Sequence, residues 1–337
     1  MLEGRDKDKL TPLMRACKEK NSAQVATLLA TSEIDLDLTD LTVNHKLAIQ
    51  LAAPISGDPC EVSEEVRAIV QCFWALSDEY LNRGARKTLH YLFLYAAWIG
   101  DEAGVERCLR LEVDPNVQHL ECGALWEAAS NGYEPIVARL LAHPGINVNL
   151  PNYRGDTAII TALEWGYLEI AYRLLARPDC SLGPGSYFFG TPLTAAVHFG
   201  HQEFARAVMA QWERCDIHYT ALAVTLCIRK GAEWDWLLLA LLDRGASVSE
   251  GEDLLHESAA AGPGWAHQET QEAPLGCGDW NMRTFQSPWS EAVAYDNHYA
   301  MQLLRDRGAD PASVTRWSPM RAAWMSAVIS ARQAPHV

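Results

Sequence analysis

A carboxylate and an imidazole occupy the same place in two similar stretches of the sequence. Glu164 stands two residues before Gly166, and His198 stands two residues before Gly200. If the two stretches stack side by side, the two groups can act on a ligand as general base and general acid. The alternative is two unrelated polar groups on a solvated surface, which is the more common situation.

Two other pairs have the spacing of metal ligands. His198 and His201 stand three residues apart, but Gly200 between them breaks the helix that would place them on one face. His119 and Cys122 have no second pair to complete a site. The sequence therefore predicts no metal site and no cofactor, and a structural hydrogen-bonding role for His201.

Sequence motifs of common enzyme classes are missing. The chain has no GxSxG, no GxxxxGK[ST] and no GxGxxG. The Gly-rich stretch GPGSYFFG, residues 183–190, follows no predicted strand and contains no lysine, so it is interpreted as a widened hairpin. Whether the protein is an enzyme stays open, and these absences favour a protein without catalytic activity.

The elements that must position these residues repeat along the chain. The stretches 123–141, 157–175 and 190–209 align, with Gly132, Gly166 and Gly200 spaced 34 residues apart. In the last stretch Thr191 and Pro192 predict a helix start. A small-residue pair then keeps the helix thin, the glycine ends it, and an apolar run forms a second helix. A short helix pair cannot cover its own apolar surface, so several pairs must stack.

This pattern resembles the ankyrin repeat, TPLHxAAxxGHxxIVxLLLxxGADxN. The resemblance implies an all-α solenoid of stacked antiparallel helix pairs with short hairpin loops. About nine degenerate repeats are expected in a single domain, 1–337. They start near residues 11, 44, 88, 123, 157, 191, 220, 251 and 287, with a capping helix from 318. Residues 54–65 and 263–286 are insertions in this scheme.

The resemblance also implies where a ligand binds, because partners of this family usually lie along the concave side. The matching positions are the two residues before each repeat glycine, and many of them are aromatic. They are Trp98, Ile99, Ser130, Asn131, Glu164, Trp165, His198, Phe199 and Tyr295. Exposed aromatic side chains are enriched at binding hot spots. The alternative is that some of these rings turn inward to the core.

Charge and cysteine content limit the partners and the compartment. The formal net charge is −15, from 28 basic and 43 acidic residues, which argues against nucleic acid or an anionic membrane surface as partner. No apolar run reaches the length of a membrane span, and the charged start of the chain does not look like a secretory signal. Nine cysteines without a CxxC pair predict reduced thiols in a cytoplasmic or nuclear protein.

Two functions fit these features. The first is a protein-interaction module, acting as adaptor, inhibitor or assembly factor, whose protein or peptide partner has basic character. The second is an unusual enzyme, such as a cyclase or isomerase of a biosynthetic pathway, or an accessory protein that binds an apolar or aromatic small molecule. Twelve tryptophans and irregular repeats favour the second class. An aromatic-lined closed pocket near Glu164 and His198 would distinguish it from the first.

Overall fold

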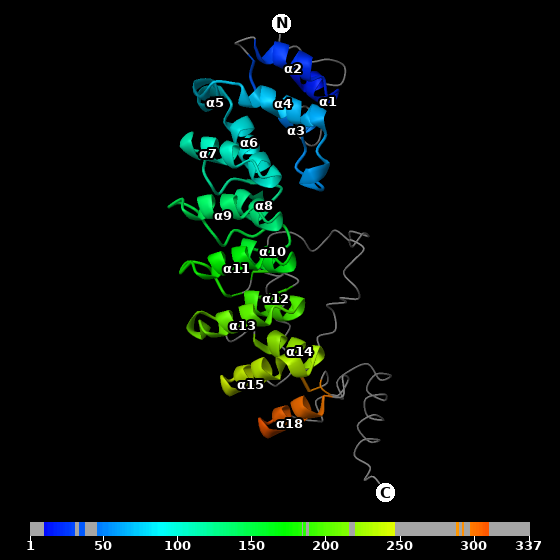
Figure 1. Cartoon of the computed structure of the whole chain (residues 1–337), viewed down its shortest axis with the longest axis vertical. Helices are drawn as coiled ribbons and strands as arrows, with labels where there is room; N and C mark the ends of the chain where they lie inside the picture. The colour runs from blue at the N-terminus through cyan, green and yellow to red at the C-terminus, as the bar shows by residue number, and fades with distance from the viewer. Residues whose placement is uncertain are drawn as a thin grey trace. The chain divides into compact units, whose positions relative to one another are not determined.

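The computed structural model describes residues 10–30, 34–37, 46–183, 185–186, 189–215, 220–246, 288–289, 292 and 297–309. Tyr295, the repeat starts near 44, 251 and 287, the insertion 263–286 and the capping helix from 318 lie outside these residues. The described residues are mainly helical, so the all-α prediction is confirmed (Figure 1). They belong to two compact units, 1–153 and 154–337, which are described separately, and the single domain stays a prediction.

Unit 1 is built from helix pairs that stack on one another. First helices pack on first helices and second helices on second: α1 on α3, α6 on α8, α2 on α4, and α7 on α9. The helices are α1 (Pro12–Lys18), α2 (Ser22–Leu29), α3 (Ala48–Ala52), α4 (Glu64–Trp74), α5 (Asp78–Gly84), α6 (Arg86–Ile99), α7 (Glu102–Arg110), α8 (Ala124–Ser130) and α9 (Glu134–Leu141).

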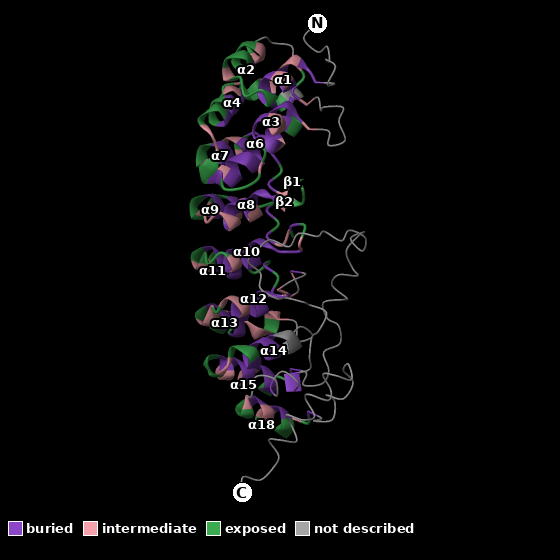
Figure 2. Ribbon diagram, turned by 90° about the vertical axis from the view of Figure 1, so that its right-hand side faces the viewer, coloured by how far each residue is buried: buried purple, intermediate pink, exposed green. Residues whose placement is uncertain are grey.

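Unit 2 repeats the same arrangement. Its first helices α10, α12 and α14 pack in sequence, α11 packs on α13, and α15 packs on α18. The helices are α10 (Ala158–Glu164), α11 (Leu168–Leu175), α12 (Pro192–Phe199), α13 (Gln202–Met209), α14 (Thr220–Lys230), α15 (Asp235–Asp243) and α18 (His298–Asp306). Short 3-10 turns, η2 (Trp212–Arg214) and η4 (Ala232–Trp234), connect some of them. Figure 2 shows the buried residues in purple along these helices.

Helix α12 shows how the sequence sets one repeat. The Thr191 hydroxyl accepts a hydrogen bond from the Thr194 amide at 3.2 Å, and Pro192 occupies the first helical position. The helix ends at Gly200, whose φ of 86° lies in the left-handed region that glycine adopts without strain. Within α12, Ala195 is fully buried, and its small side chain lets the neighbouring first helices approach closely. The predicted start and stop signals are confirmed for this repeat.

Two arginines link successive repeats through backbone carbonyl groups. In unit 1, Arg107 donates to the carbonyl of Trp74 at 2.5 Å and to that of Leu76 at 2.6 Å, at the end of α4. In unit 2, Arg214 donates to the carbonyls of Arg177 at 2.9 Å and Cys180 at 2.5 Å, beyond the end of α11. The Trp74 carbonyl ends α4, where intrahelical donors run out, and Arg107 supplies one; the Arg177 carbonyl also accepts the Cys180 amide at 3.2 Å.

Unit 1 departs from a plain helix-pair repeat in three places. The predicted insertion 54–65 contains a short 3-10 turn, η1 (Pro59–Glu61), and the sequence analysis did not predict α5 at all. A two-stranded hairpin, β1 (Gln118–His119) and β2 (Cys122–Gly123), precedes α8. Its turn residues Leu120 and Glu121 have φ of 50° and 64°, the left-handed backbone of a tight two-residue hairpin.

The start of α6 is held by a residue far away in the sequence. The Asp37 carboxylate accepts hydrogen bonds from the amides of Lys87 at 2.9 Å and Thr88 at 2.8 Å. A carboxylate at a helix N-terminus satisfies free donors and favours the positive end of the helix dipole. Asp37 therefore fixes the first turn of α6 against the segment that follows α2.

Candidate functional site

The predicted binding positions of unit 1 are mostly covered. Trp98 is only 4% exposed and packs beside Tyr95, with ring centroids 5.6 Å apart. Every residue of α6 from Tyr91 to Trp98 is buried, so the prediction of an exposed ring at Trp98 is wrong and the inward alternative holds there. Ile99 is half-buried.

The two polar positions of unit 1 are also half-buried, and both bond to their own helix. Ser130 donates to the Glu127 carbonyl at 3.0 Å, and Asn131 donates to the same carbonyl at 2.9 Å. These contacts close the end of α8. The structure therefore gives Ser130 and Asn131 a role in ending a helix, and their role in binding stays a prediction.

The corresponding positions of unit 2 are more open. Trp165, which follows α10, is 62% exposed. Phe199 and His198, at the end of α12, are half-buried and meet Phe189 from the preceding loop. The ring centroids of His198 and Phe199 lie 4.6 Å apart, and those of Phe189 and Phe199 lie 4.9 Å apart. We call Trp165, Phe189, His198 and Phe199 the unit 2 aromatic surface.

His198 is a neutral imidazole near neutral pH. Its burial, together with the positive charges of Lys230 and Arg229, lowers the pKa to about 4. The lowered pKa disfavours the charged form. The ring therefore contributes mainly as an aromatic surface next to Phe199 and Phe189.

Glu164 belongs to an ion-pair network that the sequence analysis missed. Arg154 donates to the Glu164 carboxylate at 2.7 Å and, through Nε, to Asp156 at 2.7 Å. The Asp156 side chain is fully buried and also accepts a hydrogen bond from the Ser186 hydroxyl. Burial raises the pKa of Glu164, while Arg154 opposes that shift. The sequence signal for this network was the charged pair Arg154 and Asp156, which stands immediately before the N-cap residue of α10.

The remaining candidate ligands have structural positions. The Nε2 of His201 donates to the Leu163 carbonyl at 2.8 Å, which ties α13 to the preceding repeat as expected. His119 and Cys122 face each other across the hairpin. Within the described parts of the chain, no cluster of three or more His, Cys, Asp or Glu side chains could hold a metal ion.

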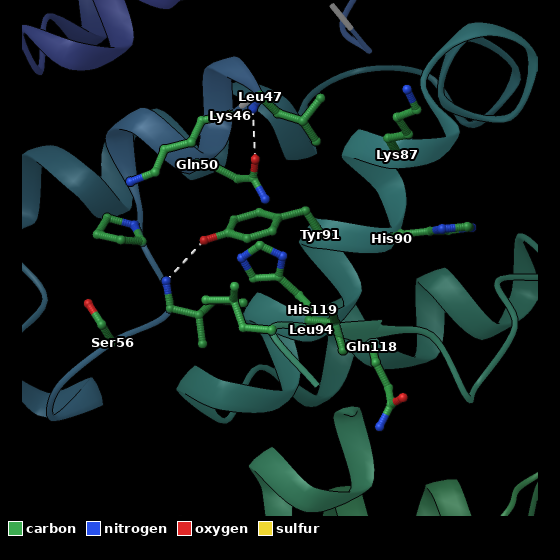
Figure 3. Close-up of a pocket in the computed structure, with 13 residues that line it drawn as sticks. Lys46, Leu47, Gln50, Ser56, Lys87, His90, Tyr91, Leu94, Gln118 and His119 are labelled. Carbon is green, nitrogen blue, oxygen red and sulfur yellow. Dashed lines mark hydrogen bonds between the residues drawn. The ribbon is translucent and has the colours of Figure 1, made fainter. Parts of the chain in front are cut away.

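The structure places a pocket in unit 1 that the sequence analysis did not predict (Figure 3). It has a volume of about 730 Å³ and lies between the start of α3, one face of α6 and the β1–β2 hairpin. Pockets of about 300–1,000 Å³ are typical for small ligands. The sequence signals near it were the insertion that begins at residue 54 and the pair His119 and Cys122. Neither signal shows by itself that α3, α6 and the hairpin converge.

Tyr91 at the centre of this pocket fixes one of its walls. Its hydroxyl donates to the Ala53 carbonyl at 2.6 Å and accepts from the Ile55 amide at 2.9 Å. These two bonds hold the loop that follows α3 against α6. Burial raises the pKa of Tyr91, so the phenol keeps its proton. The ring also meets His119 edge-on, at a centroid distance of 5.4 Å.

The polar part of the pocket is cationic. Lys46, Lys87, His90 and His119 line it, and none of its thirteen described lining residues is Asp, Glu or Arg. Burial lowers the pKa of His119, and the charge of Lys46 adds to the effect. Burial also lowers the pKa of His90, with a further contribution from Arg86. Both imidazoles therefore favour the neutral form.

Comparison with known proteins identifies part of the chain. The family model of ankyrin repeats, in three copies, matches residues 93–184. These three repeats are thus confirmed, whereas the predicted total of nine is not. No curated protein matches the sequence significantly.

One solved structure with a matching chain is that of the predatory endopeptidase Bd0816 from Bdellovibrio bacteriovorus in complex with immunity protein Bd3460. The identity is 19%, the TM-score is 0.43, and the match covers 64% of this chain and 97% of the other.

Among the described residues, no helix combines the length and apolar character needed to cross a membrane.

Proposed function

We propose, from the ankyrin repeats in residues 93–184, that the protein is a non-enzymatic interaction module that binds a protein partner through the unit 2 aromatic surface. The single observation that carries the proposal is Trp165, which is 62% exposed. Tryptophan is among the residues most enriched at binding hot spots, because it supplies a large contact area at low entropy cost. Burying this ring against a partner removes a large apolar area from water.

The surroundings of Trp165 support a docking surface. Phe199 occupies the same position one repeat later, and α10 and α12 pack directly on each other. Arg154 holds Glu164 next to Trp165, which adds a fixed polar group at the edge. Rigid aromatic anchors with polar groups around them are typical of protein interfaces. The net charge of −15 favours a partner with basic character, and the proposed roles are adaptor, inhibitor or assembly factor.

The catalytic alternative receives less support from the geometry. Burial raises the pKa of Glu164, but its carboxylate already accepts a hydrogen bond from Arg154 at 2.7 Å, which ties it to the ion-pair network. His198 has a pKa lowered to about 4, which makes its conjugate acid rare near neutral pH. We therefore do not propose Glu164 and His198 as a catalytic pair.

The test removes the exposed ring and compares it with a matched control. Trp165→Ala should lower the affinity for the captured partner at least tenfold, the effect of losing a binding hot spot. Tyr299→Ala is the control, because Tyr299 lies on α18 and is 47% exposed, outside the proposed surface. The partner is captured from native lysate, identified by mass spectrometry and titrated against each variant by calorimetry.

The circular dichroism spectrum of both variants should match that of the original protein. If Trp165→Ala binds the partner as tightly as Tyr299→Ala does, the unit 2 aromatic surface is not the contact. If the lysate yields small molecules and no protein partner, the function proposed for the whole chain fails.

A further inference from the structure

The pocket of unit 1 carries charge of the opposite sign to the protein as a whole. The chain has a net charge of −15, yet the charged residues that line the pocket are two lysines, Lys46 and Lys87. Two histidines, His90 and His119, add groups that can gain a proton. A concave site lined by one sign of charge concentrates ligands of the opposite sign. The pocket thus favours an anionic group.

The apolar part of the pocket limits what carries that anion. Leu94 and Ile55 line it together with the ring of Tyr91, whose hydroxyl is already bonded to the backbone. At the hairpin tip Leu120 is 74% exposed, the most exposed large apolar residue of the described part of the chain. An apolar or aromatic group fits against these residues and covers mainly Ile55 and Leu120, because Leu94 and Tyr91 are already only 2% and 3% exposed.

A carboxylate fits the polar part better than a phosphate. Phosphate sites commonly use arginine forks or free amides at a helix N-terminus. The lining contains no arginine, and the first amides of α6 already donate to the carboxylate of Asp37. Of the two lysines, Lys46 is the one whose charge acts on His119. Lys46 supplies one positive charge and the His119 imidazole an N–H donor, which suits a single carboxylate.

We propose that the unit 1 pocket binds a carboxylate attached to an aromatic or apolar body, with the carboxylate between Lys46 and His119 and the body against Leu94, Ile55 and the Tyr91 ring. Figure 3 shows His119 beside Tyr91 in the middle of the pocket, with Lys46 on the α3 side. The carboxylate belongs either to the C-terminal residue of a peptide or to a free small acid. The proposal does not depend on the unit 2 aromatic surface.

Binding of a carboxylate is coupled to a proton on His119. Burial and Lys46 lower the pKa of the His119 imidazole, and an anion bound beside it would raise that pKa again. The titratable groups that share the pocket with His119 are Lys46 from the segment before α3 and Lys87, His90 and Tyr91 from α6, and Cys122 is its partner in the hairpin register. Tyr91 keeps its proton, because burial raises its pKa. The affinity for a carboxylate should therefore rise as the pH falls from about 8 to about 6.

The first experiment uses N-acetyl-L-phenylalanine and its neutral amide as probes of the full chain. The acid should bind in calorimetry with uptake of a proton, and the amide should bind at least tenfold more weakly. Lys46→Met should weaken binding of the acid about tenfold or more, whereas Lys18→Met, on the exposed end of α1, should leave it unchanged. His119→Gln is a second variant that removes the proton uptake.

A spectroscopic measurement separates a direct role from a structural one. The imidazole of His119 is titrated by NMR with and without each probe, and its pKa should rise with the acid and stay constant with the amide. The proposal is overturned if the amide binds as tightly as the acid or if neither probe binds. It is also overturned if both Lys46→Met and His119→Gln keep full affinity for the acid.

The source of the carboxylate is decided by a second comparison. An octapeptide that ends in a phenylalanine carboxylate is titrated beside N-acetyl-L-phenylalanine. Tenfold tighter binding of the peptide assigns the pocket to a protein C-terminus, and equal binding assigns it to a free small acid. Trp165→Ala leaves this pocket intact, so the result does not depend on whether the proposed protein partner binds at unit 2.

Discussion

Glu127 in α8 offers the sharpest test of the energetics of unit 1. It is 7% exposed, and burial raises the pKa of its carboxyl group from 4.5 to about 7. Moving a carboxylate into a poorly solvated interior disfavours its charged form. Replacement by glutamine keeps the shape and polarity of the side chain and removes the ionisation. We expect Glu127→Gln to stabilise the protein, with an effect that depends on pH.

The sign and size follow from the pKa in the two states. Because the folded-state pKa lies above the unfolded value, the folded protein holds the proton more tightly. Its stability is then greatest below pH 4.5, falls as the pH rises from 4.5 through about 7, and levels off above that pH. The shift of about 2.5 pKa units at 1.36 kcal/mol per unit amounts to about 3 kcal/mol at pH 8. At pH 5 the same calculation leaves under about 1 kcal/mol.

Urea unfolding at pH 5 and pH 8, followed by far-ultraviolet circular dichroism, measures this difference. Glu127→Gln should raise the free energy of unfolding by about 3 kcal/mol at pH 8 and by much less at pH 5. Glu134→Gln, an exposed residue at the start of α9, is the matched control and should change stability little at either pH. An equal effect of Glu127→Gln at both pH values would refute the reasoning, because it would show that Glu127 is charged and solvated in the folded protein.

Three further substitutions test the repeat and the ion-pair network. Gly200→Ala should cost about 1–2 kcal/mol from its positive φ alone, because the space around it is open. Gly100→Ala should cost more, because the added Cβ would lie 2.8 Å from the Tyr133 ring, and equal urea midpoints for the two variants would contradict this. Arg154→Met should cost about 3 kcal/mol, because it leaves the buried carboxylate of Asp156 without its cation, and an unchanged melting temperature would show that the pair adds nothing.

The sequence was sufficient for the architecture because the repeat signals are local. Thr191, Pro192 and Gly200 act on the backbone within one helix, so their effect can be predicted without knowing the neighbours. The recurrence of such signals then predicts stacking. The exact number of repeats is harder to predict, because insertions such as 54–65 and the additional helix α5 change the period.

The site could not be predicted to the same depth, because burial depends on neighbours. Trp98 and Trp165 occupy closely similar places before a repeat glycine, yet one is 4% exposed and the other 62%. Helix α6 is 14 residues long and apolar on most faces, whereas α10 has only seven residues. The repeat motif specifies the position of a side chain along the chain. The surrounding helices determine whether that side chain is buried or exposed.

The pocket shows a second limit. Its walls come from three separate parts of the chain, at residues 46–56, 87–94 and 118–120, and only the fold brings them together. The insertion was visible in the sequence, but the hydrogen bonds that fix its first residues to Tyr91 were not. The network around Arg154 was missed for the same reason. Ser186, which donates to Asp156 in this network, lies thirty residues further along the chain than Asp156.

Arg107 and Arg214 each make the end of one repeat's second helix depend on the repeat that follows. When the following repeat opens, the carbonyls of Trp74 and Leu76, or of Arg177 and Cys180, lose these guanidinium donors. Within each unit, these contacts increase the interface free energy between neighbouring repeats relative to the intrinsic stability of a single repeat. The ratio of these two terms sets the cooperativity of unfolding in a linear array of repeats. Native-state hydrogen exchange should therefore show the linked repeats opening together rather than singly.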